Sequence, residues 1–269
     1  MSAAAAVPIF EEVAGTGPLL ISFPHSGMHV PPGLAARLEP AALDLPDTDW
    51  FVPQLYDFFR DLGASAIRAT HTRYVVDLNR PPDGAALYPG QRETTVCPTE
   101  TFDGEPLYRP GQGPTAAEVT ERLRTHWQPY HDRLCALSQQ IARRHGFCIL
   151  WDAHSIHSRV PGLFQGRLPD LNVGTAGGHS CSPGVLERVV APLKAQSDFS
   201  FVVDGRFKGG YITRHYGNPA AHIEAVQLEI AQSAYLIEAR VPVYEPERAR
   251  PLNALLRNLL SQVAPATSP

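Results

Sequence analysis

Two histidines in this chain stand where apolar runs end. His25 closes the run PLLISFPH, and His154 follows Asp152 at the end of FCILWDAH. A buried strand presents a polar residue at its tip, where a ligand can reach it. A lone histidine at a strand end is more often held by the backbone, but two such coincidences favour one site. Two histidines and a carboxylate form the donor set of a hydrolytic zinc site, so we expect an enzyme.

The carboxylate of this set has more than one candidate. Asp152 lies two residues before His154, so on a strand the two side chains share a face and the carboxylate could orient the imidazole. Asp47 and Asp49 in the segment DTDW are candidates for a third ligand. Acidic residues also cap helices, and for this pair alone capping is the stronger interpretation. The spacing does not decide between the two aspartates.

Glu229 is a carboxylate within the apolar stretch QLEIAQ. Burial raises the pKa of a glutamate toward neutrality, which is what a general base requires. The alternative is a glutamate on the exposed face of an edge strand.

Arginines in two segments could bind an anion. TRYVVDLNRP contains Arg73, Asn79 and Arg80, and the glycine-bearing segment GRFKGGYITRHYG contains Arg206 and Arg214. The guanidinium group pairs with a carboxylate through two parallel hydrogen bonds. Solvated surface charges are the alternative in both segments. Neither segment contains a phosphate-binding P-loop or a dinucleotide-binding glycine motif.

Composition excludes several classes of protein. The chain has 269 residues, 43% hydrophobic and 19% charged, with a net charge of −4. This balance gives no basic surface for nucleic acid. No apolar run reaches the length of about 20 residues that a membrane span needs, and the amino terminus does not resemble a signal peptide. Four scattered cysteines predict free thiols in a reducing cytoplasm.

Strands and helices are expected to alternate, which predicts one α/β domain over residues 1–269 with its core at about 18–262. The Pro/Gly-rich residues 81–115 are expected to form a long functional loop. A proline, Pro129, is expected to kink the longest helix. Strands are expected at 18–25, 65–70, 72–79, 147–155, 200–207 and 223–230, and helices at 47–64, 115–146, 184–196 and 248–263.

Seven segments together resemble the N-formylglutamate amidohydrolase (deformylase) family of histidine catabolism. They are PHSG, DTDW, TRYVVDLNRP, WDAHSI, FQGRLPDLNVGT, RFKGGYITRHYG and QLEIAQ, in one order over about residues 18–235. The family in turn is similar to the zinc carboxypeptidases and aspartoacylases. The resemblance implies a mixed, mostly parallel sheet of about eight strands flanked by helices. It also implies hydrolysis of N-formyl-L-glutamate to formate and L-glutamate with one zinc ion.

The resemblance also implies roles for single residues. Arg73 would polarise the scissile carbonyl, and Asn79 with Arg80 would hold a substrate carboxylate. Glu229 would activate the water that attacks, and His154 would be the second histidine ligand. Because the substrate carries two carboxylates, Arg206 or Arg214 is expected to bind the other.

One position departs from the wider group, which has a glutamate three residues after its first histidine ligand. Met28 stands there and cannot supply a carboxylate. The resemblance therefore moves the third ligand to DTDW, where Asp47 is favoured and Asp49 is the alternate. With His25 and His154 this set accepts zinc, and cobalt, manganese or iron as well.

Two other functions stay open. One is a deacylase or carboxypeptidase for another N-acyl acidic amino acid. The other is a non-catalytic domain that binds an anion or a metal, without a base beside the metal. The partner expected from the residues is a small anionic N-acyl amino acid, with neither nucleic acid nor membrane, and the oligomeric state is left open.

Overall fold

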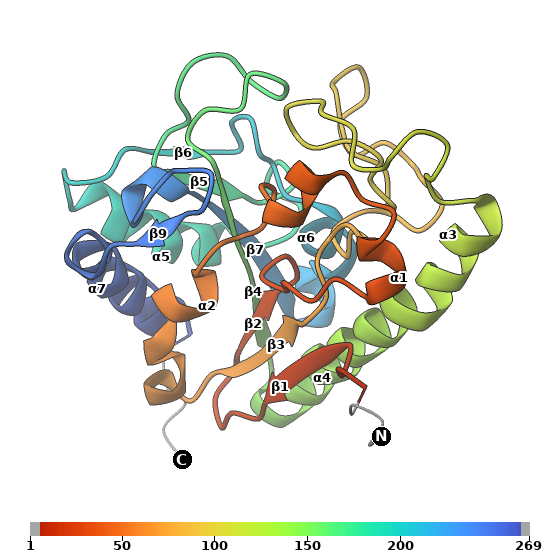
Figure 1. The fold of residues 1–269 in the computed structure, drawn as a ribbon. Helices are drawn as coiled ribbons and strands as arrows, with labels where there is room; N and C mark the ends of the chain where they lie inside the picture. Colours follow the sequence, from red (N-terminus) through yellow and green to blue (C-terminus); the bar gives the residue numbers. More distant parts are fainter. Residues whose placement is uncertain (1–5, 265–269) are drawn as a thin grey trace.

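A seven-stranded sheet forms the centre of the computed structural model, which describes residues 6–264 (Figure 1). The strands are β1 (Phe10–Val13), β2 (Leu19–Phe23), β3 (Ser65–Ala69), β4 (Cys148–Ile156), β5 (Leu171–Gly174), β6 (Phe201–Val203) and β7 (Ile223–Ala231). Their order is β1-β3-β2-β4-β7-β5-β6. Only the β1–β3 and β5–β7 pairs are antiparallel. The expected mixed, mostly parallel sheet is confirmed, with seven strands; β8 (Leu236–Ile237) and β9 (Val243–Tyr244) pair separately.

Helices cover both faces of this sheet. One apolar cluster joins the sheet to α2, α5 and α7, and the other joins it to α1, α4 and α6, in agreement with the layers of Figure 1. The helices are α1 (Pro32–Ala35), α2 (Val52–Leu55), α3 (Ala116–Arg122), α4 (Gln128–His145), α5 (Pro183–Lys194), α6 (Tyr211–Tyr216) and α7 (Pro246–Val263). The result is the single α/β domain that the alternation predicts.

The apolar runs form strands because both faces of the sheet are covered. Every residue of β2 and β4 is buried. Side chains alternate between the two clusters, since Ile21 and Trp151 pack with α7 while Leu20 and Leu150 pack with α4. The two strands that present the predicted histidines are therefore central and rigidly held.

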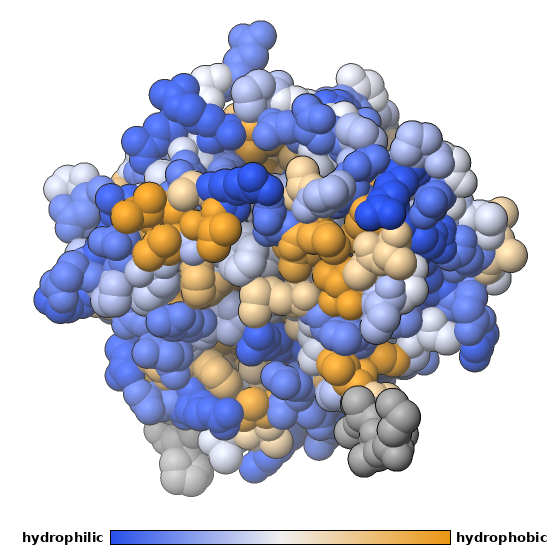
Figure 2. Space-filling view, viewed as in Figure 1, coloured by the Kyte–Doolittle hydropathy of each residue, from blue (hydrophilic) through white to orange (hydrophobic). Residues whose placement is uncertain are grey.

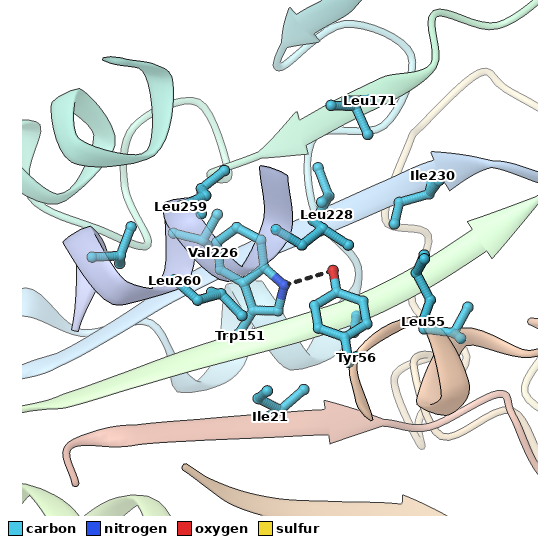
Figure 3. Close-up of a cluster of buried hydrophobic side chains, with 14 of the residues drawn as sticks. Ile21, Leu55, Tyr56, Trp151, Leu171, Val226, Leu228, Ile230, Leu259 and Leu260 are labelled. Atoms are coloured by element: carbon cyan, nitrogen blue, oxygen red, sulfur yellow. Dashed lines mark hydrogen bonds between the residues drawn. The ribbon is translucent and has the colours of Figure 1, made fainter. Parts of the chain in front are cut away.

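One hydrogen bond lies inside the first of these clusters. Trp151 Nε1 donates to the hydroxyl of Tyr56 over 3.0 Å, and both side chains are fully buried (Figure 3). Tyr56→Phe should lower the free energy of unfolding by about 1–3 kcal/mol, because the indole N–H then stays buried without an acceptor. Urea titration measures this, with Tyr244→Phe as the control on a half-buried ring. Equal effects of the two substitutions would contradict the role of this hydrogen bond.

The helix predicted over 47–64 is wrong. Phe51 has φ 61° and ends the preceding turn, so α2 begins only at Val52 and is followed by a 3-10 helix at Asp57–Leu62. Asp47 and Asp49 are buried in the loop before it, and neither caps α2.

The strand predicted over 72–79 is also wrong. The segment forms turns: Val75 N donates to Thr72 O, and the Asp77 side chain accepts from Asn79 N. Val75 and its apolar neighbours are buried in the cluster that joins the sheet to α1, α4 and α6, although the segment pairs with no strand of the sheet. Burial of a loop and burial of a strand leave the same apolar pattern in the sequence.

The other predicted elements are present, but the strand predicted over 200–207 is only β6, and β1, β5, α1 and α6 were not predicted. The helix predicted over 115–146 is α3 and α4 joined by a π-helical turn, Leu123–Trp127. Pro129 lies in the first turn of α4 and has no backbone N–H to donate to the preceding turn. The loss of this hydrogen bond accompanies the wider π-helical turn before it. Residues 81–115 contain no helix or strand, as expected. All four cysteines are free. No helix between residues 6 and 264 is long and apolar enough to cross a bilayer.

Candidate active site

The carboxyl ends of β2, β4 and β7 meet at one edge of the sheet, under the yellow and green loops at the top of Figure 1. The side chains there line a cleft of about 570 Å³, counting the part open to solvent. His25 follows β2, and His154 of β4 lies directly opposite Glu229 of β7 in the register of the two parallel strands. The topology thus brings together residues that the sequence separates widely.

His25, Asp49 and His154 form a buried cluster whose ligand atoms all lie within 4.8 Å of one another. Asp49 Oδ2 is 2.9 Å from His154 Nδ1 and 3.8 Å from His25 Nδ1. Ligand atoms around a tetrahedral zinc ion lie about 3.4 Å apart, so the spacing fits a small divalent cation. The backbone holds Asp49 here, because Asp49 N donates to His25 O over 3.1 Å.

The outer ring nitrogens of both histidines face carboxylates. His25 Nε2 lies 2.7 Å from Asp77, and His154 Nε2 lies 3.1 Å from Asp152. A proton on each Nε2 can be donated to these carboxylates, and in that tautomer both Nδ1 lone pairs are directed at Asp49. Converging lone pairs repel unless a cation or proton lies between them. Such carboxylate partners are also what metal-bound histidines require, so the donor set fits a metal.

The two histidines differ in their electrostatic surroundings. Burial lowers the pKa of His25, with the charge of Arg73 acting in the same direction. Burial also disfavours the charged form of His154, but Asp152 and Asp49 outweigh it and raise that pKa well above its usual value. A positive charge is thus stabilised at the His154 side of the cluster, beside Asp49.

Asp47, the favoured third ligand, lies outside the cluster. Its carboxylate accepts a hydrogen bond from the Tyr74 hydroxyl over 3.0 Å and faces Phe102 N at 3.2 and 3.3 Å. Burial raises its pKa to about 6. The side chain therefore ties the chain near residue 47 to the long loop, and the geometry favours the alternate, Asp49.

Glu229 is buried beside this cluster and lines the cleft. Its Oε2 accepts a hydrogen bond from Gln227 Nε2 over 3.2 Å. Burial raises its pKa to about 7, and the nearby His154 opposes that shift. A carboxyl group that changes charge near neutral pH next to a metal-type donor set can act as a general base.

Arg73 also lines the cleft, held by a carboxylate that the sequence analysis missed. Its guanidinium donates to Asp77 over 2.5 Å and to Asp47 O over 3.3 Å, and it lies over the Phe102 ring. Asp77 is fully buried between Arg73 and His25. Its burial raises its pKa, but the two partners outweigh burial and hold it well below the usual value. The sequence does contain a signal for Asp77, because it is a carboxylate inside an apolar segment and stands four residues after Arg73.

Asn79 is fully engaged within the protein. Its Nδ2 is 3.3 Å from Asp152 Oδ2 and 3.0 Å from His154 Nε2, and its Oδ1 accepts from Ile212 N over 2.8 Å. Gly210 packs directly on this amide, and a Cβ there would lie 2.3 Å from Nδ2. Contact between Asn79 and substrate stays a prediction, and these contacts favour a role in orienting His154 and Asp152.

Arg80 and Arg206 line the cleft, whereas Arg214 does not. Neither Arg80 nor Arg206 has a carboxylate within 4.0 Å among residues 6–264. Burial lowers the pKa of Arg206, and the charge of Arg80 adds to the shift. Tyr88, also missed from the sequence, lies between Arg206 and Arg214, 5.5 and 5.0 Å from their guanidinium carbons. The two unpaired charges make this side of the cleft suited to an anion.

Comparison with known proteins agrees with the resemblance found in the motifs. The family model of N-formylglutamate amidohydrolase matches residues 17–236. A Pseudomonas putida relative named N-formylglutamate deformylase is 47% identical over 246 residues, covering 91% of this chain and 92% of its own. A Pseudomonas aeruginosa relative with the same name is 47% identical over 249 residues, covering 93% of each chain.

A solved structure shows the same fold. The crystal structure of N-formylglutamate amidohydrolase from Ralstonia eutropha matches with a TM-score of 0.79 at 23% identity, covering 95% of this chain and 98% of that one. The match of the family model over most of the chain, with two relatives at 47% identity, identifies the family. This chain therefore belongs to the N-formylglutamate amidohydrolase family.

Proposed function

We propose that the protein hydrolyses N-formyl-L-glutamate to formate and L-glutamate with the help of a divalent metal, zinc in the first place. The observation that carries the proposal is Glu229, a buried carboxyl with a pKa of about 7, lying directly across from His154. A domain that only binds an anion or a metal has no use for such a base. Family membership and the names of the two Pseudomonas relatives support the substrate.

The residues of the cleft divide the reaction between them. His25, Asp49 and His154 would hold the metal, which would supply a Lewis acid when bound. Glu229 accepts the proton of the attacking water and returns it to the nitrogen of the leaving amine. Arg73 offers its guanidinium to the oxyanion that develops on the formyl carbon.

The two unpaired arginines would bind the substrate carboxylates. Arg80 and Arg206 both line the cleft, close enough for the charge of one to act on the other, and neither has a carboxylate partner of its own in the described chain. A dicarboxylate would neutralise both and replace the water they lose on burial. Arg214 lies outside the cleft against Tyr88, so we assign it to the support of the loop. The free thiols suit a reducing compartment such as the cytoplasm.

The test is a substrate series with purified protein. N-formyl-, N-acetyl- and peptidyl-L-glutamate are compared by kcat/KM, with release of formate, acetate or amino acid measured directly. Formylglutamate should be preferred by at least about tenfold, since the two relatives at 47% identity are named for this substrate. Preference for the acetyl or peptidyl compound would make the protein another N-acyl amino acid hydrolase.

Arg80→Met should raise KM for formylglutamate about 10- to 100-fold, because a charge-assisted pair is worth about 1.5–3 kcal/mol. A formamide without carboxylates should react equally well with both proteins. Arg214→Met is the matched control and should change KM for the diacid by less than about threefold. Steady-state kinetics on both substrates decides the matter; a larger effect from Arg214→Met would reverse the assignment of the two arginines.

A further inference from the structure

Gln227 links the base to the glycine-bearing loop. It stands on β7 two residues before Glu229, on the same face of the strand, and its side chain is 3% exposed. Its Oε1 accepts a hydrogen bond from Gly210 N over 2.6 Å, and its Nε2 donates to Glu229 Oε2 over 3.2 Å. One buried amide therefore joins the two elements.

The orientation of this amide follows from chemistry. The backbone N–H of Gly210 can only donate, so the oxygen of the amide must face it. The NH2 end then faces Glu229, and a carboxylate is the acceptor that such a donor requires. The alternative orientation would place two donors 2.6 Å apart on one side. The contact thus holds Glu229 Oε2 and leaves Oε1 as the atom without a hydrogen bond in the described chain.

Gly210 is a fixed point of the loop that carries Arg206. It is the N-cap residue that precedes α6, and it packs on Asn79 so closely that no Cβ fits. The carbonyl of Gly209 accepts from the Tyr88 hydroxyl over 2.9 Å, which ties the long loop to the same place. A shift of this loop would therefore move its contact with Gln227, and through it Glu229.

We propose that Gln227 is a positioning residue that fixes the rotamer of Glu229 and couples it to the anion-binding loop of Arg206. The inference rests on the proposed function. Gln227 sets which carboxylate oxygen accepts the proton, and an anion bound at Arg206 stabilises the loop conformation that holds Gln227. Binding of the substrate at Arg206 then also aligns the carboxylate of Glu229.

A double-mutant cycle tests this. Gln227→Met keeps the volume and removes both hydrogen bonds, and it should lower kcat about 10- to 100-fold. In the Glu229→Gln background the same substitution should lower kcat by less than about threefold, because its target is already lost. KM for formylglutamate should rise in both backgrounds, and calorimetry should show weaker binding of L-glutamate by Gln227→Met.

Gln232→Met is the matched control, since it removes another buried amide that does not contact Glu229. Its effect on kcat should be equal in the two backgrounds. An equal loss from Gln227→Met in both backgrounds would overturn the positioning role while leaving the proposed function intact. A wild-type protein that releases no formate would overturn both proposals.

Discussion

Glu229→Gln should lower kcat for formylglutamate about 10²- to 10⁴-fold, the range that general base catalysis supplies. The amide has the shape of the carboxyl but cannot accept the proton of the attacking water. Because Glu229 lies outside the three-residue metal cluster, the bound metal per protein should not change. Formate release and elemental analysis on the same preparations measure the two quantities.

A control on the same strand separates chemistry from stability. Glu224 stands at the amino end of β7, away from the cleft, and accepts a hydrogen bond from Ser182 N. Glu224→Gln makes the same chemical change there and should leave kcat within about threefold. Wild-type turnover by Glu229→Gln would mean that another group takes the proton, and the proposed mechanism would be wrong.

Asp49→Asn should abolish stoichiometric metal binding and with it the activity. The substitution removes the only carboxylate among the three candidate ligands and leaves two neutral imidazoles. Loss of a residue that only hydrogen-bonds to a metal ligand already weakens metal affinity about 10- to 100-fold. Loss of a ligand itself should weaken the affinity by at least the same factor. Equilibrium dialysis with zinc followed by elemental analysis gives the stoichiometry.

Asp47→Asn is the matched control two residues away. Its carboxylate contacts Tyr74 and Phe102 instead of the histidines, so the variant should bind metal normally. The substitution should instead lower the free energy of unfolding by about 1–3 kcal/mol, because it weakens the hydrogen bonds of a buried group. The reverse pattern, with metal lost from Asp47→Asn and retained by Asp49→Asn, would restore Asp47 as the ligand.

The parts of the site that lie on strands could be predicted. The runs before His25 and His154 are apolar because both faces of β2 and β4 are covered, and that pattern is local in the sequence. Glu229 could be singled out because a carboxylate inside such a run is costly without a partner. The roles of the arginines came from resemblance to the family, since charge alone does not distinguish a substrate site from a solvated surface.

The parts that lie on loops could not be predicted. A backbone hydrogen bond to His25 O places Asp49, and not Asp47, beside the two histidines, and no local pattern in the sequence records this contact between segments. Asp77 was missed because its segment was assigned to a strand, whereas it lies in a turn and its carboxylate is buried between Arg73 and His25. The periodicity of apolar residues indicates that a side chain is buried, but it does not indicate which distant segment packs against it.

Asn79 and Gly210 restrict each other's evolution. A Cβ at position 210 would lie 2.3–2.5 Å from the amide atoms of Asn79, and that amide is held by three other groups and cannot turn aside. No residue larger than glycine can become established at 210 while asparagine stands at 79. The two positions are inherited as a pair, and an alignment of relatives should show side chains at 210 only where 79 carries a smaller residue.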